Sequence, residues 1–355
     1  MIAGLVAFAL YLYFYIGIPK IVEVLDSINT ANYAFYYSLA LVAVMASVFF
    51  WSLAWNSILR SLSIKISYRR TYLYYWVGYF SDLVLPCGTV CGELTRLYLA
   101  QKHTSKSYGI LAASAVTNRL VAYVIVALGL YSGAILLFLK PNVPPVISNV
   151  FVVFLIGVTI YLVILLYLAF VKQAAQNITT AYKKILKTLR PKHYQNDVET
   201  QANASLSSYY EGFKVFRENP RLLLKPLFIH FISYLTGLAV YIFIFYALGF
   251  PASTPEFYIV IYFIAVAVQD AAASFSVGSL DIILASILLL YGFNPGLSAI
   301  TALLLRSVGF WFPLFVGFLS VQVLGTRSLI YHIPQMEKSG TKEQDSQKEL
   351  SSNST

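Results

Sequence analysis

Two pairs of oppositely charged residues lie within strongly apolar stretches and have almost the same spacing. Glu93 precedes Arg119 by 26 residues, and Asp281 precedes Arg306 by 25. A charge at the centre of a membrane helix costs about 2.5–3.5 kcal/mol, so it normally faces the protein interior and finds a partner. An arginine there offers a planar fork of donors that suits a phosphate group. The pairs predict either structural ion pairs or a site where Arg119 and Arg306 bind an anion.

A break in the apolar sequence comes shortly before each acid. The breaks contain residues that interrupt or begin helices: Pro86, Gly88 and Gly92 in the first, and Ser276, Gly278 and Ser279 in the second. A broken helix presents unpaired backbone groups and a positive end, which membrane proteins tolerate only inside protein or beside a wet cavity. Glu93 and Asp281 would serve there as counter-charges to the arginines. A simpler interpretation of each acid is a first-turn carboxylate that offsets the helix dipole.

Three further charged residues are candidates for the same sites. Asp82 lies 11 residues before Glu93. Asp270 lies 11 residues before Asp281, so the two additional acids occupy matching positions. We expect both to lie near a cavity as counter-charges, or to join the two arms of a hairpin. Arg96 follows the first break and is a third candidate for binding phosphate.

The composition is that of an integral membrane protein. The chain has 355 residues, of which 59% are hydrophobic and 11% are charged, and its mean hydropathy is +0.71; soluble domains contain about 25% charged residues. Several apolar runs reach the roughly 20 residues that cross a bilayer as a helix, and the alternating segments of membrane barrels are absent. The net charge of +10 does not indicate nucleic-acid binding, because the basic residues collect in a few loops between spans.

No cofactor, metal or disulfide framework is expected. Cys87 and Cys91 lack partners for a metal site at their spacing, and a packing role is favoured for both. The four histidines are scattered along the chain: His103, His193, His230 and His332. The phosphate-binding loop of nucleotide hydrolases is also absent from the sequence.

Apolar runs of sufficient length predict six full spans, at residues 2–18, 33–58, 108–139, 146–171, 227–249 and 297–324. Shorter apolar segments flank the two breaks and predict helical hairpins at 72–101 and 257–293. We therefore predict an all-α, polytopic membrane domain over residues 1–333. A polar, disordered tail is expected at 334–355.

The distribution of positive charge predicts the topology. Residues 172–225 contain ten of the 25 Lys and Arg residues, and such a basic loop is typical of the cytoplasmic side. This loop shares a side with the basic loops at 60–70 and 102–106 only if the first hairpin enters and leaves the membrane on one side. The same argument, applied to the tail, makes 257–293 a hairpin as well. We therefore predict two re-entrant hairpins of opposite orientation, with both termini in the cytoplasm. Such an inverted repeat is found in many transporters; chance similarity of two hydrophobic hairpins is the alternative.

Two blocks of residues resemble the flippase-like integral membrane proteins, a family similar to the transmembrane region of lysylphosphatidylglycerol synthases. The first block is Leu85–Tyr98 with Ala113–Arg119, and the second is Gly278–Asp281, Tyr291–Phe293 and Ala299–Gly309. The resemblance covers roughly residues 1–330. The second block departs from the family pattern, which has a Pro/Gly-rich break followed by Glu where this chain has serines and an Asp.

The resemblance implies a flippase or scramblase that moves a lipid between leaflets. It also implies a multi-pass protein of a prokaryotic cell membrane. The soluble aminoacyl-transferase domain of the synthases is not found, so lysine transfer is not expected. The expected partners are membrane lipids, either a phospholipid or a polyprenyl-phosphate-linked glycan. An ion gradient or a lipid- or glycan-modifying enzyme is expected to act with the protein. Two other functions stay open: a membrane-embedded transferase acting on a lipid-linked sugar with Glu93 or Asp281 as general base, and a non-transporting partner of a surface-glycan enzyme.

Overall fold

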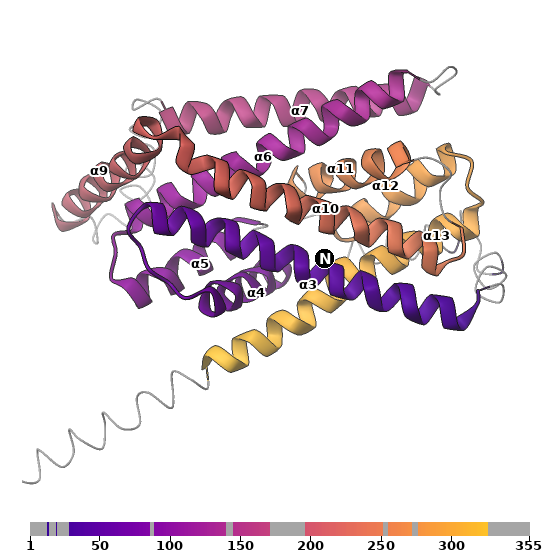
Figure 1. The fold of residues 1–355 in the computed structure, drawn as a ribbon, viewed down its shortest axis with the longest axis horizontal. Coiled ribbons are helices and arrows are strands. Elements are labelled where there is room, and N and C mark those ends of the chain that lie inside the picture. The colour runs from indigo at the N-terminus through magenta and orange to yellow at the C-terminus, as the bar shows by residue number, and fades with distance from the viewer. Residues whose placement is uncertain are drawn as a thin grey trace, which may run out of the picture.

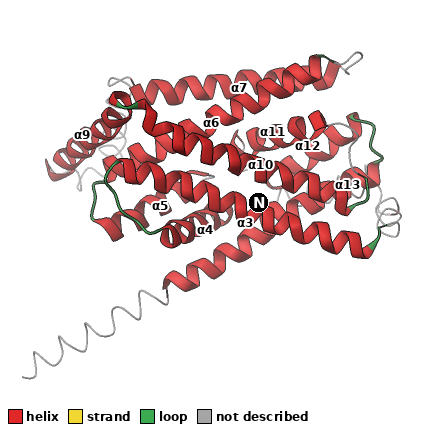
Figure 2. Ribbon diagram, in the orientation of Figure 1, coloured by secondary structure: helices red, strands yellow, loops and turns green. Residues whose placement is uncertain are grey.

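A computed structural model describes the chain at residues 28–85, 89–139, 145–170, 196–250, 255–271 and 276–325, together with Tyr13 and Pro19. All regular secondary structure in these ranges is helical, as Figure 2 shows, which confirms the all-α part of the predicted fold class. The predicted span at 2–18, the tail at 334–355 and the break residues Pro86 and Gly88 lie outside these ranges. So do the side chains of three predicted site residues: Asp270, Ser276 and Ser279.

Four of the described helices are long and apolar enough to cross a membrane. They are α3 (Thr30–Ser61), α6 (Tyr108–Phe138), α10 (Leu224–Ala247) with the short 3₁₀ turn η3 (Pro220–Leu223) before it, and α13 (Pro295–Arg306), which continues through the π-helical turn η4 (Ser307–Trp311) to Gly325. A fifth helix, α7 (Pro145–Phe170), contains the shorter apolar stretch Phe151–Tyr167. These helices coincide with five of the six predicted spans, and the full count of crossings stays a prediction.

Polar residues just before the long helices explain where they begin. Asn29 accepts hydrogen bonds at its side-chain oxygen from the backbone N–H groups of the first turn of α3. Ser107 caps α6 and Asn294 caps α13 in the same way. Pro295 then occupies the first position of α13, where a missing N–H costs nothing. These caps satisfy donors that the first turn of a helix leaves unpaired.

Two helical hairpins stand where the sequence predicts them. The first consists of α4 (Tyr68–Val84) and α5 (Thr89–Thr104), and the second of α11 (Pro255–Ala271) and α12 (Ser276–Leu290). The first hairpin lies beside α3, and the second lies beside α6 and α10 (Figure 1). Arg70, near the start of α4, contacts the ring of His103, near the end of α5, at 2.6 Å from Nη1 to Nε2. The two ends of the first hairpin therefore lie together, and its re-entrant course through the membrane stays a prediction.

The central core is formed where the long helices meet the second hairpin. Tyr234 of α10, Tyr123 of α6 and Phe263 of α11 belong to one cluster of buried side chains. Glycines allow the closest approaches: a Cβ on Gly129 would meet the ring of Phe263, and one on Gly237 would meet the hydroxyl of Tyr262. A separate cluster around Trp76 and Trp55 packs the first hairpin against α3. Each hairpin is thus held by its own part of the core.

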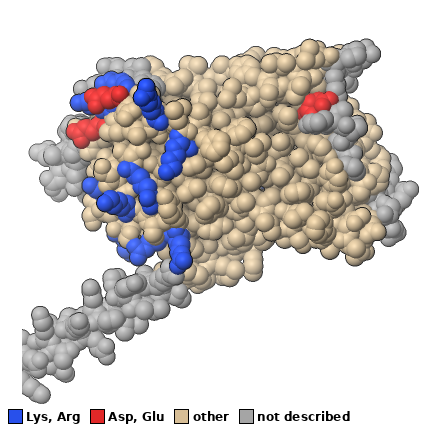
Figure 3. All heavy atoms as spheres, viewed as in Figure 1, with Lys and Arg blue, Asp and Glu red and all other residues tan. Residues whose placement is uncertain are grey.

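The predicted basic loop at 172–225 contains a helix in its described part. This helix, α9 (Asn196–Glu218), lies against α6. Phe213 is buried there, and Gly212 brings the α9 backbone close to Ala113. On the face shown in Figure 3, Lys and Arg side chains gather at the α9 end of the molecule. The exposed basic residues of the adjoining helix ends include Arg60, Arg69, Lys102, Lys106, Lys214, Arg217 and Lys225, which is the one-sided distribution that the topology prediction needs.

Candidate functional site

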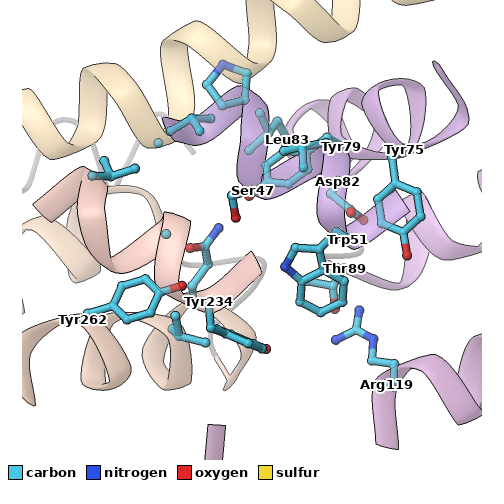
Figure 4. A pocket seen from close by; sticks show the side chains of 18 of the residues that line it. Ser47, Trp51, Tyr75, Tyr79, Asp82, Leu83, Thr89, Arg119, Tyr234 and Tyr262 are labelled. Atoms are coloured by element: carbon cyan, nitrogen blue, oxygen red, sulfur yellow. The ribbon is translucent and has the colours of Figure 1, made fainter. Parts of the chain in front are cut away.

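A cavity of about 250 Å³ opens at the meeting point of both hairpins and the long helices. Figure 4 shows side chains from several of these elements converging on it. Aromatic side chains make up much of its wall: Trp51, Tyr75, Tyr79, Tyr234, Tyr241 and Tyr262. Its charged residues all belong to the first hairpin or to α6: Asp82, Glu93, Arg96 and Arg119. The second hairpin contributes Tyr262, Val266 and Gln269, all from α11.

Glu93 and Arg119 form an ion pair in the wall of the cavity. Nε of Arg119 donates to Oε1 of Glu93 over 2.5 Å. Arg96, one turn further along α5, approaches the same oxygen at 3.8 Å. The side chains keep 26% of their surface exposed for Glu93, 15% for Arg119 and 11% for Arg96. The predicted pairing within the first half of the chain is thus confirmed, and one carboxylate serves two guanidinium groups.

Tyr75 of α4 supports Arg96 and links it to α6. The guanidinium carbon of Arg96 lies 4.5 Å from the centre of the Tyr75 ring, as in a cation–π contact. The Tyr75 hydroxyl accepts a 2.9 Å hydrogen bond from the side-chain amide of Asn118, the residue before Arg119. A second, water-sized space of about 10 Å³ lies among Tyr75, Glu93, Arg96 and Asn118. The arginines are therefore held by neighbours on three helices.

Asp82 joins the two arms of the first hairpin, which is one of its two predicted roles. Its Oδ1 accepts a 2.6 Å hydrogen bond from the backbone N–H of Gly92. A Cβ at position 92 would lie only 2.2 Å from Asp82 Oδ2 and 2.3 Å from the carbonyl oxygen of Gly78. Gly92 is thus needed because the backbones approach closely, not because the chain bends there. Asp82 also lines the cavity, so its predicted place is confirmed as well.

The sequence favours a packing role for Cys91, the residue before Gly92. In the structure this cysteine is disulfide-bonded, so that prediction is wrong. Cys87 lies outside the described residues. Over the part of the chain that the structure describes, no group of three or more His, Cys, Asp or Glu side chains is placed to hold a metal ion.

The second pair, Asp281 and Arg306, is buried away from the cavity. Nε of Arg306 lies 2.8 Å from Oδ1 of Asp281, and Nη2 lies 2.7 Å from Oδ2. Asp281 is 1% exposed and Arg306 is 9% exposed. Asp281 Oδ2 also accepts the N–H of Gly278, whose φ of +88° favours glycine. The ion pair is therefore present for this acid. The first-turn interpretation is wrong for Asp281, because α12 begins at Ser276 and has no acidic residue in its first turn, and it is wrong for Glu93 in α5 for the same reason.

The second pair differs from the first in its position relative to the cavity. The lining of the described cavity includes Leu305 and Gly309 but not Arg306. Arg306 instead lies 5.5 Å from the centre of the Phe310 ring, at the start of the π-helical turn. The extra residue in a π turn changes which side chains face inward. The two halves are alike in pairing and unlike in access.

Sequence reasoning missed the polar network behind the cavity wall. His230 of α10 is fully buried, and its Nε2 lies 2.9 Å from Oδ1 of Asn118. In the sequence, His230 is only one of four scattered histidines. The available signal was its place in an apolar run, where a polar side chain needs a partner as much as a charge does. Asn118, directly before Arg119, was the other half of that signal.

These features define a polytopic helical membrane protein with an ion-paired arginine in an internal cavity. The chain belongs to the family described as the lysylphosphatidylglycerol synthase TM region, whose model matches residues 1–317. A relative from Pyrococcus horikoshii, the "UPF0104 membrane protein PH1989", is 20% identical over 298 residues, which are 82% of this chain and 87% of the relative. No solved structure matches the chain. The predicted family resemblance is therefore confirmed, and a lipid-related role in the membrane follows from it at the level of the family.

Proposed function

We propose that this protein is a lipid flippase or scramblase that holds a phosphate-bearing head group in the cavity and moves it between leaflets. One observation carries the proposal: an arginine pair on a single, partly exposed carboxylate lies in the wall of a cavity among membrane-spanning helices. Arginine forks bind phosphate oxygens in pairs. The low-dielectric surroundings strengthen such a contact relative to water.

Glu93 is the member of the cluster that can give way to phosphate. It is the most exposed of the three charged side chains, and it shares one oxygen between two arginines. Asp82 is tied to the Gly92 N–H, so it keeps the hairpin closed while Glu93 moves. An arriving phosphate would take over the donors of Arg119 and Arg96, and Glu93 would take them back when the lipid leaves. This exchange avoids leaving a bare charge inside the membrane, which would be costly.

The size of the cavity supports a head group as the occupant. Its volume of about 250 Å³ is just below the about 300–1,000 Å³ of pockets that enclose drug-sized ligands. Two acyl chains do not fit in that space together with a head group. We therefore propose that the chains stay in the bilayer while the polar part passes through. The aromatic wall, which includes Trp51 and Tyr234, would line its route.

Translocation in reconstituted vesicles tests the proposal. Vesicles of phosphatidylcholine and phosphatidylglycerol would carry a trace of fluorescent phosphatidylglycerol, and a membrane-impermeant reductant would report the probe in the outer leaflet. We expect the protein to speed exchange between leaflets. Arg119→Ala and Arg96→Ala should slow it at least about tenfold, equivalent to about 1.4 kcal/mol. Arg69→Ala, at an exposed basic position on α4, is the matched control and should leave the rate unchanged.

Two outcomes would contradict the proposal. The first is a wild-type rate equal to that of protein-free vesicles, both for phosphatidylglycerol and for a fluorescent polyprenyl phosphate. The second is normal translocation by an Arg119→Ala protein that remains folded. Mass spectrometry of lipids from a deletion strain would then distinguish the transferase alternative, since a missing modification indicates an enzyme and a normal lipid on the wrong leaflet indicates a flippase. We place the protein in a prokaryotic cell membrane, where an ion gradient or a partner enzyme would set the direction.

A further inference from the structure

His230 is a buried histidine whose second ring nitrogen lacks a hydrogen-bond partner. Its Nε2 points to the amide oxygen of Asn118, which only accepts, so Nε2 carries a hydrogen. Its Nδ1 is buried and has no hydrogen-bond partner among the described residues. The Trp51 ring packs against the imidazole at a centroid distance of 4.5 Å. A buried polar atom without a partner is rare enough to need a reason.

The imidazole is connected to the charged wall of the cavity through two hydrogen bonds. Asn118 accepts from His230 and donates to the Tyr75 hydroxyl, and the Tyr75 ring supports Arg96. Asn118 and Tyr75 both line the cavity, while His230 stands behind them. The water-sized space beside Tyr75 and Asn118 also borders Glu93. A polar space of that size can hold one water molecule.

The groups that surround His230 set its charge. Trp51 faces it from α3, Asn118 from α6 and Tyr234 from its own helix, with ring centroids of His230 and Tyr234 6.5 Å apart. None of these three side chains carries a charge at neutral pH. The charged groups on this side belong to the cavity wall, namely Asp82, Glu93, Arg96 and Arg119. The charge in the cavity therefore decides whether the positive form of the imidazole becomes accessible.

We propose that His230 is a proton-binding site linked to occupation of the cavity, so that a proton enters with an anionic head group. This inference rests on the proposed function, because it names what balances the charge of the cargo. An anion in the cavity stabilises a positive imidazole, and by linkage a protonated His230 strengthens anion binding by the same factor. The proton adds to Nδ1, whose lone pair has no other partner among the described residues, and it is released when the head group leaves. A proton gradient would thereby drive a translocation that needs no nucleotide.

Nitrogen NMR of the imidazole tests the linkage directly. The full chain would carry ¹⁵N-histidine in phosphatidylcholine nanodiscs, with His103→Gln, His193→Gln and His332→Gln leaving His230 as the sole signal. We expect a neutral Nε2–H form at pH 7 without anionic lipid. Adding phosphatidic acid should raise the midpoint of His230 titration by about one pH unit, a tenfold change in proton affinity. An unchanged midpoint with phosphatidic acid bound would overturn the proposal.

Two variants decide the linkage even if phosphatidic acid fails to bind. Arg119→Ala removes a positive charge from the cavity and should raise the midpoint, whereas Glu93→Gln removes a negative charge and should lower it. If neither variant moves the midpoint, the linkage is wrong whatever lipid the protein binds. If both move it but phosphatidic acid does not bind, the lipid-phosphate function is at fault and the linkage stands.

The affinity for phosphatidylglycerol, whose phosphodiester keeps one charge across this pH range, is measured by native mass spectrometry and supplies the second readout. Wild-type affinity should fall as pH rises through the His230 midpoint. His230→Gln retains a donor for Asn118 but cannot take up a proton, so its affinity should be independent of pH over that interval. His103→Gln, at the exposed end of α5, is the matched control and should behave as the wild type does. A pH-dependent His230→Gln protein would overturn the proposal.

Discussion

The two acid–arginine pairs have the same chemistry and nearly the same spacing, but their surroundings differ. Glu93 and Arg119 share a single short contact, lie in a cavity wall and have a second arginine close by. Asp281 and Arg306 make contacts through two nitrogens and two oxygens, and the acid is 1% exposed. Asp281 also holds a backbone N–H of its own hairpin. The first pair has room to exchange partners, whereas the second is already fully occupied.

This difference predicts a ligand-binding role for the first pair and a structural role for the second. Removing one partner of a fully buried pair is costly, because the remaining charge has no water around it. A partly exposed pair loses less, because water and nearby charges replace the partner. If the chain descends from an inverted repeat, one half has kept an accessible arginine and the other has used the same pair to fix a helix. Breaking each pair in turn measures that division.

The largest effect is expected from Arg306→Ala. This change leaves Asp281 buried without its partner, so the free energy of unfolding should fall by about 3–5 kcal/mol. Arg119→Ala should cost no more than about 1 kcal/mol, since Glu93 keeps Arg96 nearby and contacts the cavity. Thermal unfolding of both variants in nanodiscs provides the comparison.

A double variant shows whether the loss comes from the unpaired charge. Replacing both members of the second pair, Asp281→Leu with Arg306→Leu, should recover most of the stability, because no charge is then left buried. Equal losses for Arg306→Ala and Arg119→Ala would contradict the proposed difference between the pairs.

The next largest loss of stability is expected where the backbones of α4 and α5 approach each other closely. Gly92→Ala places a Cβ 2.2 Å from Asp82 Oδ2 and 2.3 Å from the Gly78 carbonyl, so α4 and α5 must separate. Overpacking of this kind costs about 1–3 kcal/mol. In the second hairpin, Gly278→Ala should cost about 1–2 kcal/mol for a different reason, the positive φ of +88°. Gly157→Ala on α7, where a Cβ would meet nothing within 4 Å, is the control for both in thermal unfolding. A neutral Gly92→Ala would show that the hairpin arms are not tightly apposed.

The pairing of the charges could be predicted from the sequence, because a charge in an apolar helix has few ways to avoid the bilayer. That rule predicted both ion pairs, and the spacing of Asp82 predicted a place either near the cavity or between the hairpin arms. Apolar length gave the helices, and the breaks gave the hairpins. Two short charged segments, 60–70 and 102–106, also predicted which helix ends gather at the basic end.

Access to the cavity could not be predicted in the same way. Leu305 lines the cavity and its neighbour Arg306 does not. Which of two adjacent helix residues faces inward depends on how α13 packs against the other helices, and the sequence does not give that packing. The partners of His230 lie on α6, 112 residues away, so only tertiary packing brings them together. The close approach of Gly92 to Gly78 is likewise a property of two helices rather than of either sequence alone.

Lysine substitutions sharpen the comparison by keeping the charge and removing the fork. Arg306→Lys loses one of the two parallel contacts with Asp281, so it should lower the free energy of unfolding by about 1–2 kcal/mol. Arg119→Lys replaces a single contact, so its stability should stay within about 0.5 kcal/mol of the wild type. Its lipid translocation should nevertheless fall, because an ammonium cannot hold two phosphate oxygens in one plane. Vesicle translocation and thermal unfolding, measured on both variants, separate the two effects. A loss of stability in Arg119→Lys together with a loss of translocation in Arg306→Lys would contradict the proposed roles.

The smallest effect concerns the ends of the first hairpin, which the Arg70–His103 contact joins. Burial and the charge of Arg70 lower the pKa of His103. The unfolded chain therefore binds more protons near its ordinary pKa of about 6.5, so this contact stabilises the hairpin above that pH and the stability is lost on acidification. Because His103 is mostly exposed and solvent screens it, the change should be at most about 0.5 kcal/mol. The protection factors of the α4 and α5 amides, corrected for the intrinsic pH dependence of exchange, should fall slightly in acid in the wild type and not in His103→Gln. Equal acid sensitivity of α11 and α12 would show that the effect does not arise from this contact.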